Sequence, residues 1–228
     1  IGASTSSSLH LDSSYDFDSN MAVVVAGDIP DPRDREGYLS ALERVLVDAH
    51  LAMGGSVLTL FTNRRDMEEL YARVEPKLAR ASLELNCQQR NSSPRRLRDR
   101  FINEPTSSLF ALKAFWERNL REDRAWARYS LPEAVLEVKQ AAGRLIRSST
   151  DSGVLILADP RLVTKGYGKK FLTSLPTSSY QRIESAQIGS YLQLWRARHE
   201  LRCESGQTRV FAISHRRFDR VGSSKMRM

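Results

Sequence analysis

An amide and two guanidinium groups lie close together on one short segment of this chain. Gln140 and Arg144 are four residues apart, and Arg147 follows three residues later. On a helix these spacings place the three side chains on one face, where they can meet a single polyanion. Gly143 lets a backbone or a phosphate come close. Two arginines and an amide aimed at one point indicate stabilisation of negative charge on a transferring phosphoryl group.

Other polar side chains directly follow short apolar runs that are typical of buried strands. They are Thr62 and Asn63 after residues 56–61, Lys113 after 108–112, and Asp159 after 154–158. Because ligands bind beyond the carboxyl ends of the strands in open parallel sheets, we expect these groups to lie near a binding edge. We also expect Asp159 to form an ion pair with Arg161. Thr62 and Asn63 either hydrogen-bond DNA phosphates or cap a helix that starts near Arg64, and both roles can hold together.

Short apolar runs alternate along the chain with longer segments of helical periodicity. The sequence predicts strands over residues 21–26, 56–61, 83–87, 108–112, 154–158 and 209–213. It predicts helices over residues 36–53, from about 64 to about 76, and over 95–101, 131–146 and 188–201. This alternation indicates an α/β fold with a mostly parallel sheet covered by helices on both faces.

Composition narrows the class of protein. The chain has 228 residues, of which 41% are hydrophobic, and a net charge of +8, which fits a globular protein with a polyanionic partner. No apolar run approaches the ~20 residues that cross a bilayer, and the start lacks a signal peptide, so we expect no membrane contact. Two isolated cysteines suit a reducing cytoplasm, where we expect the protein. Cys87 and Cys203 have no metal-ligand spacing, which predicts no metal site in this chain. The sequence does not start with Met, as in a fragment or a processed protein.

The run Gln-Ala-Ala-Gly-Arg-Leu-Ile-Arg at residues 140–147 resembles motif VI of superfamily 2 helicases in the DinG/XPD branch. The remaining matches keep the order of that branch. Residues 56–63 resemble motif IV, 109–117 resemble the start of motif V, 130–134 precede motif VI, and 151–161 and 167–176 follow it. The resemblance runs from about Ser14 to Pro176.

This resemblance implies a motor of two RecA-like domains that closes over ATP and moves 5′ to 3′ along single-stranded DNA, in DNA repair or replication. We expect an arm at residues 1–20, the second RecA-like domain, a three-layer sandwich, at 21–180, and a C-terminal helix and strand extension at 181–228. The sequence contains neither a Gly-x-x-x-x-Gly-Lys-Ser/Thr phosphate loop nor an Asp-Glu-x-His motif. ATP and Mg²⁺ are therefore expected at the interface with a first domain outside this chain, which would also hold any iron–sulfur cluster, and the isolated chain should not hydrolyse ATP.

The resemblance also implies roles for the residues of motif VI. Arg144 and Arg147 would act as arginine fingers toward the γ-phosphate, and Gln140 would orient the attacking water or that phosphate. Gly143 and Glu117 would contribute to nucleotide binding. The alternative for Arg144 and Arg147 is a solvated basic helix face, and the alternative for Gln140 is a surface amide.

The implied DNA contacts are Thr62, Asn63, Arg64, Lys113 and Trp116. Trp116 either stacks on a base or packs in the core, and Arg64 either binds phosphate or solvates its helix. The dense arginine run at residues 95–100 either contacts DNA or forms a solvated helix face.

One departure from the family concerns motif V. In relatives Gly-Val-Asp and a longer stretch follow Trp-Glu, whereas Glu117 here runs directly into Arg118. That stretch is either deleted from this protein or missing from this sequence, and we favour the second.

The main rival function is a RecA-like module that binds nucleic acid or protein without ATPase activity, and a stand-alone nucleotide hydrolase is the third.

Overall fold

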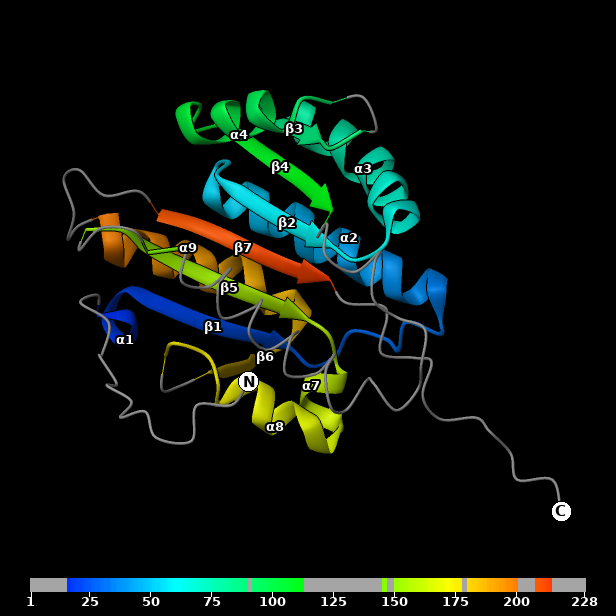
Figure 1. The fold of residues 1–228 in the computed structure, drawn as a ribbon, viewed down its shortest axis with the longest axis vertical. Helices are drawn as coiled ribbons and strands as arrows, with labels where there is room; N and C mark the ends of the chain where they lie inside the picture. Colours follow the sequence, from blue (N-terminus) through cyan, green and yellow to red (C-terminus); the bar gives the residue numbers. More distant parts are fainter. Residues whose placement is uncertain are drawn as a thin grey trace, which may run out of the picture.

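The computed structural model describes residues 16–89, 92–112, 145–146, 150–177, 180–200 and 208–214, which form one α/β unit (Figure 1). Within these residues seven strands form one sheet in the order β3-β4-β2-β7-β5-β1-β6, and neighbouring strands are parallel. The strands are β1 (Met21–Ala26), β2 (Val57–Phe61), β3 (Glu84–Cys87), β4 (Ser107–Leu112), β5 (Ser152–Ala158), β6 (Gln181–Ile183) and β7 (Thr208–Ser214). The predicted parallel α/β fold is confirmed.

Helices pack on both faces of this sheet. They are α1 (Phe17–Asn20), α2 (Arg35–Met53), α3 (Arg64–Ala79), α4 (Pro94–Asn103), α7 (Arg161–Thr164), α8 (Gly166–Leu172), the 3₁₀ turn η2 (Ser185–Gln187) and α9 (Ile188–Glu200). One hydrophobic core joins the sheet to α2, α3 and α9, and a second joins its other face to α7 and α8. The result is the three-layer arrangement of a RecA-like sandwich.

Strand β1 shows how the sequence produces these layers. Its six residues are all buried: Ala22, Val24 and Ala26 contribute to the first core, whereas Met21, Val23 and Val25 contribute to the second. Successive side chains of a strand point to opposite faces, so a continuous apolar run is what a strand covered on both sides requires.

Local signals set the ends of α2, the longest of these helices. The Asp34 side chain accepts a hydrogen bond from the backbone N–H of Gly37 at 3.1 Å, which satisfies a donor of the first turn. Gly54 ends the helix in the left-handed conformation, with φ of 67°, where a side chain would be strained.

The structure differs from the sequence prediction at several elements, and the short helices α1, α7 and α8 were not predicted. Helix α3 continues through Pro76 to Ala79, because Leu78 is fully buried and its packing outweighs the lost backbone donor. The three-residue edge strand β6 was not predicted. The sequence predicts a helix over residues 131–146, but Leu145 lies in a turn and Ile146 lies in no regular element. Residues 131–144 of that predicted helix lie outside the described residues.

Strand β7 lies in the middle of the sheet, between β2 and β5. Its residues belong to the segment that the sequence assigned to a C-terminal extension. A boundary near residue 180 therefore does not separate the strands of this sheet, and helix α9 packs beside α2 on the same face.

Candidate nucleic-acid and nucleotide site

The carboxyl end of β2 carries the predicted DNA contacts Thr62 and Asn63. Asn63 is the N-cap of α3: its Oδ1 accepts the backbone N–H of Arg65 at 2.9 Å, and its Nδ2 donates to Asp66 Oδ2 at 3.2 Å. The capping role of Asn63 is confirmed. A contact with DNA phosphate stays a prediction; Thr62 and Asn63 are half-exposed and lie between β2 and α3.

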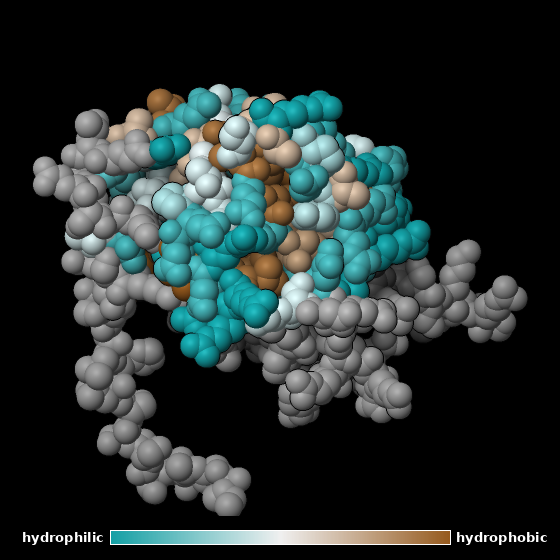
Figure 2. Space-filling model, turned by 90° about the horizontal axis from the view of Figure 1, so that it is seen from above, coloured by the Kyte–Doolittle hydropathy of each residue, from teal (hydrophilic) through white to brown (hydrophobic). Residues whose placement is uncertain are grey.

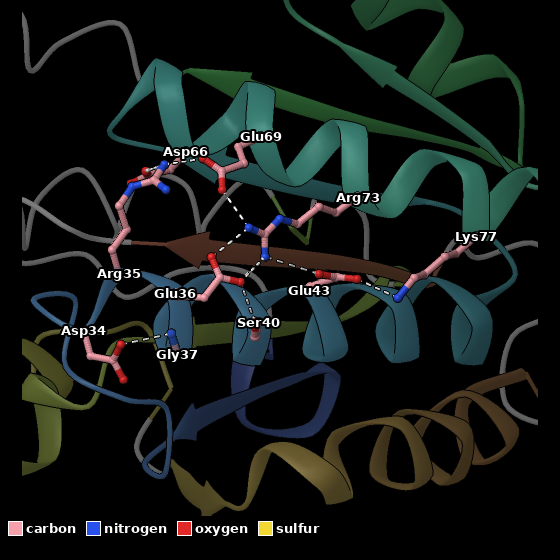
Figure 3. A network of polar contacts seen from close by, with 10 residues as sticks. All are labelled: Asp34, Arg35, Glu36, Gly37, Ser40, Glu43, Asp66, Glu69, Arg73 and Lys77. Carbon is pink, nitrogen blue, oxygen red and sulfur yellow. Dashed lines mark hydrogen bonds and ion pairs between the residues drawn. The ribbon is translucent and has the colours of Figure 1, made fainter.

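Asp66 connects this cap to a charged network between α2 and α3 (Figure 3). Its carboxylate is buried and contacts Arg35 Nη2 at 3.3 Å, and the same guanidinium pairs with Glu69. The hydrogen bond with Glu69 raises the pKa of Arg35, and the same bond lowers the pKa of Glu69. These pairs fix the start of α3, and with it Asn63, against α2.

The second half of the network runs along the two helices away from the site. Arg73 donates to both carboxylate oxygens of Glu36, at 2.8 and 2.9 Å, and to Glu69 at 2.7 Å, while Lys77 pairs with Glu43. A bidentate guanidinium–carboxylate pair fixes orientation as well as distance. This cluster is therefore structural, because every charge in it has a partner on the facing or the same helix.

Gln88 ties the carboxyl ends of β3 and β4 to the start of α3. Its backbone carbonyl accepts Arg64 Nη1 at 3.4 Å, and its side-chain Oε1 accepts the backbone N–H of Leu112 at 2.9 Å. The starts of α3 and the ends of β3 and β4 thus meet at one edge. Gln88 was not among the predicted site residues, and its position directly after a predicted strand was the available signal.

Cys87, beside Gln88, is half-buried, and burial raises its pKa to about 11. At neutral pH it is a thiol rather than the nucleophilic thiolate.

The predicted ion pair between Asp159 and Arg161 is confirmed beyond the carboxyl end of β5. Arg161 Nε donates to Oδ1 at 2.8 Å and Nη2 donates to Oδ2 at 3.0 Å, while the backbone N–H of Arg161 also contacts Oδ1 at 3.0 Å. Both residues are buried, at 2% and 3% exposure. A buried pair of this kind orders the strand-to-helix turn into α7.

Of the run from Gln140 to Arg147, only Leu145 and Ile146 belong to the described residues, and both are fully buried in the second core. The Leu145 side chain lies over Gly153, where a Cβ would come within 2.4 Å of Leu145 Cγ. Gly153 is the second residue of β5, whereas Asp159 directly follows the strand, about 20 Å farther along it. The core of motif VI therefore meets the sheet near the amino end of β5, away from the edge that holds Asn63 and Asp159.

The short link between Arg147 and β5 was the sequence signal for this separation. The other predicted site residues lie outside the described residues: Lys113, Trp116, Glu117, Gln140, Gly143, Arg144 and Arg147. Across the part of the chain that the structure describes, no three His, Cys, Asp or Glu side chains are grouped to hold a metal ion. None of the helices described there has the length and apolarity that a bilayer span needs.

The parallel sheet with helices on both faces is the architecture of a RecA-like α/β sandwich. A family model, the helicase C-terminal domain, matches residues 117–178, which include the run from Gln140 to Arg147.

Three relatives extend the comparison. The chain is 22% identical over 220 residues to "3′-5′ exonuclease DinG" of Bacillus subtilis, covering 81% of this chain and 24% of that protein. It is 26% identical over 218 residues to "ATP-dependent DNA helicase YoaA" of Escherichia coli, covering 80% and 33%. A segment of 52 residues is 58% identical to "ATP-dependent DNA helicase YoaA" of Haemophilus influenzae, covering 23% and 8%.

The chain carries a DinG-type superfamily 2 helicase C-terminal domain. It spans only 24% and 33% of the two relatives that it matches over most of its own length.

Proposed function

We propose that this chain is the second motor domain of an ATP-dependent DNA helicase, which couples ATP hydrolysis to 5′-to-3′ movement on single-stranded DNA in the cytoplasm. The observation that carries the proposal is the helicase C-terminal domain match over residues 117–178, because it contains the glutamine and both arginines of the phosphoryl-transfer run. The names of the two YoaA relatives support the same activity.

In this proposal a first RecA-like domain holds ATP and Mg²⁺. Arg144 and Arg147 reach across to the γ-phosphate, where guanidinium groups stabilise the charge that develops in the transition state. Gln140 orients the attacking water, Gly143 leaves room for the phosphate, and Glu117 lies on the nucleotide side of motif V. The burial of Leu145 and Ile146 supports the assignment, since it anchors the backbone between the two arginines to the sheet.

Movement along DNA would depend on contacts at the carboxyl ends of β2 and β4. Thr62, Asn63 and Arg64 contact the phosphates from the end of β2, and Lys113 and Trp116 add a cation and a stacking ring from the segment after β4. ATP binding closes the two domains and hydrolysis reopens them, so that these contacts advance by one step. The separation between motif VI and the carboxyl ends of β2 and β5 supports a division of the domain into a nucleotide side and a DNA side.

The test uses the whole protein, which contains the first domain, with Arg144→Gln and the control Arg198→Gln, an exposed residue of α9. We expect Arg144→Gln to lower DNA-stimulated ATP hydrolysis by about 10³–10⁵-fold, the usual effect of losing an arginine finger, with DNA affinity unchanged. The control should keep both. Loss of DNA affinity with intact hydrolysis would contradict the assignment.

Two rival activities give different results in the same assays. A non-catalytic RecA-like module would bind DNA in the whole protein without hydrolysing ATP. Because one relative is named a 3′-5′ exonuclease, end-labelled DNA should also be followed without ATP. Shortening of that DNA, with no ATP-dependent unwinding, would replace the helicase by an exonuclease.

A further inference from the structure

Helix α4 presents a row of arginines to solvent. Arg95, Arg96 and Arg98 are exposed, and the side chain of Arg95 is 90% exposed. Arg95 forms a salt bridge with Asp99, and the contact is 3.9 Å long. An exposed pair at that distance contributes little, so the three guanidinium groups keep their charge available for a partner.

Arg100 on the same helix differs from these three. It contacts Glu84 at 2.9 Å and Glu104 at 3.6 Å, and it donates to Asn86 at 3.4 Å. It therefore holds the end of α4 to β3. The helix therefore has one arginine used for attachment and three exposed arginines, of which Arg95 has the long contact with Asp99.

The start of α4 lies at the edge that carries the predicted DNA contacts. Arg64 holds the backbone of Gln88 at 3.4 Å, and the chain from Gln88 to the first residue of α4 spans six residues, which reach about 20 Å at most. Gln89 and Ser92 are hydrogen-bonded to each other, with Ser92 Oγ accepting the N–H of Gln89 at 3.0 Å, which shortens this path.

The start of α3 adds Arg65, which is exposed. The face seen in Figure 2, which is the side of α3 and α4, is mostly hydrophilic, with a narrow hydrophobic strip between the hydrophilic areas.

We propose that Arg65 and the α4 arginines Arg95, Arg96 and Arg98, hereafter the α4 track, bind the phosphate backbone of a single DNA strand that continues outward from the ends of β2 and β4. This inference rests on the proposed function, because it gives the strand a path beyond the motor contacts. Guanidinium groups match phosphate oxygens in a bidentate geometry. Contacts to phosphate fix the position of the strand without reading its sequence.

The test measures the salt dependence of binding between this chain and a fluorescein-labelled oligo-dT by anisotropy. The variant is the triple substitution R95Q/R96Q/R98Q. On single strands each phosphate contact contributes about 0.7 to the slope of log K against log salt, so losing three should reduce the slope by about 2. At about 0.1 M salt this corresponds to an affinity loss of about 100-fold.

A matched control removes the same charge elsewhere. R44Q/R80Q/R198Q also changes three exposed arginines, on α2, after α3 and on α9, and it lowers the net charge of +8 by the same three units. We expect its slope to stay near that of the wild type. A third variant, R95K/R96K/R98K, keeps the charges and should keep most of the slope, which separates charge from any change in folding.

The result that overturns the α4 track is an equal slope in R95Q/R96Q/R98Q and in the control, or a wild-type chain whose binding does not depend on salt. Either outcome leaves the helicase proposal standing, because that proposal is tested separately by ATP hydrolysis in the Arg144→Gln protein. Conversely, a normal α4 slope change with unaffected hydrolysis in Arg144→Gln would overturn the motor assignment and keep the DNA track.

Discussion

His50 should make this domain sensitive to mild acid. The side chain is fully buried on α2, its Nδ1 contacts the carbonyl oxygen of Leu46, and the Phe110 ring lies against it with centroids 6.1 Å apart. Because Nδ1–H donates to that carbonyl, protonation would place the second hydrogen on Nε2, which is buried and has no hydrogen-bond partner in the part of the chain that the structure describes. Burial therefore lowers the pKa of His50 from 6.5 to about 4.

The sign of the effect follows from proton uptake on unfolding. Between pH values of about 4 and 6.5 the unfolded chain carries a proton on His50 and the folded chain does not, so the free energy of unfolding falls as the pH falls. The stabilisation is complete above the unfolded pKa. From about pH 7.5 to about pH 5 the linkage relation gives a loss of about 2 kcal/mol, and the full loss at lower pH is about 3 kcal/mol.

Urea unfolding of the wild type and of His50→Leu at these two pH values measures the effect. Hydrogen bonds with arginine lower the pKa of Glu36 and Glu69 from 4.5, so the stabilisation from these carboxylates is lost mainly below about pH 4.5, and the chosen window lies above most of that loss. The wild type should lose about 2 kcal/mol more than His50→Leu on acidification.

Equal losses in the two proteins would refute the reasoning. If His50→Leu does not fold, the His50 ring signals in an NMR titration give the same answer, since a midpoint near the unfolded value would contradict burial as the dominant cause.

Two further substitutions test the positioning of the site. Gly153→Ala places a Cβ 2.4 Å from Leu145 Cγ and 2.8 Å from the Arg209 carbonyl oxygen, so we expect a thermal-denaturation loss of about 1–3 kcal/mol; Gly166→Ala, which meets nothing within 4 Å, should be nearly neutral, and equal effects would exclude the contact. Asn63→Ala should lower stability by about 1 kcal/mol through loss of the α3 cap, measured by urea unfolding, whereas Asn63→Ser should restore most of it; no rescue by serine would argue against capping.

Much of the fold was predictable from the sequence because its signals are local. The continuous apolar runs of β1 and β5 indicate strands covered on both faces, and the 3.6-residue periodicity ending at Gly54 indicates α2. The three residues of β6 carry no such pattern, since two of them are exposed. Pro76 predicts a helix end, but burial of Leu78 continues α3 past it.

In the candidate site too, some residues are indicated by local sequence patterns and others only by tertiary contacts. Residue types and spacing alone identified the run from Gln140 to Arg147 and the capping or binding role of Asn63, because both depend on neighbours a few residues away. The use of Gln88 as a tie between Arg64 and Leu112 depends on two residues that each lie 24 positions from it in sequence. Its place after a predicted strand marks a strand end but does not indicate these two partners.

What the sequence by itself determined is therefore most of the longer elements and the cap of α3, while the chemistry of the phosphoryl-transfer run stays its prediction. The tertiary structure decided the order of the strands, with β7 inserted between β2 and β5, and placed the core of motif VI near the amino end of β5 and Asn63 at the carboxyl end of β2. The physical reason is that secondary structure follows from short-range periodicity and backbone hydrogen bonding. Strand order and the distance between sites follow from long-range burial, which only the packed sheet determines.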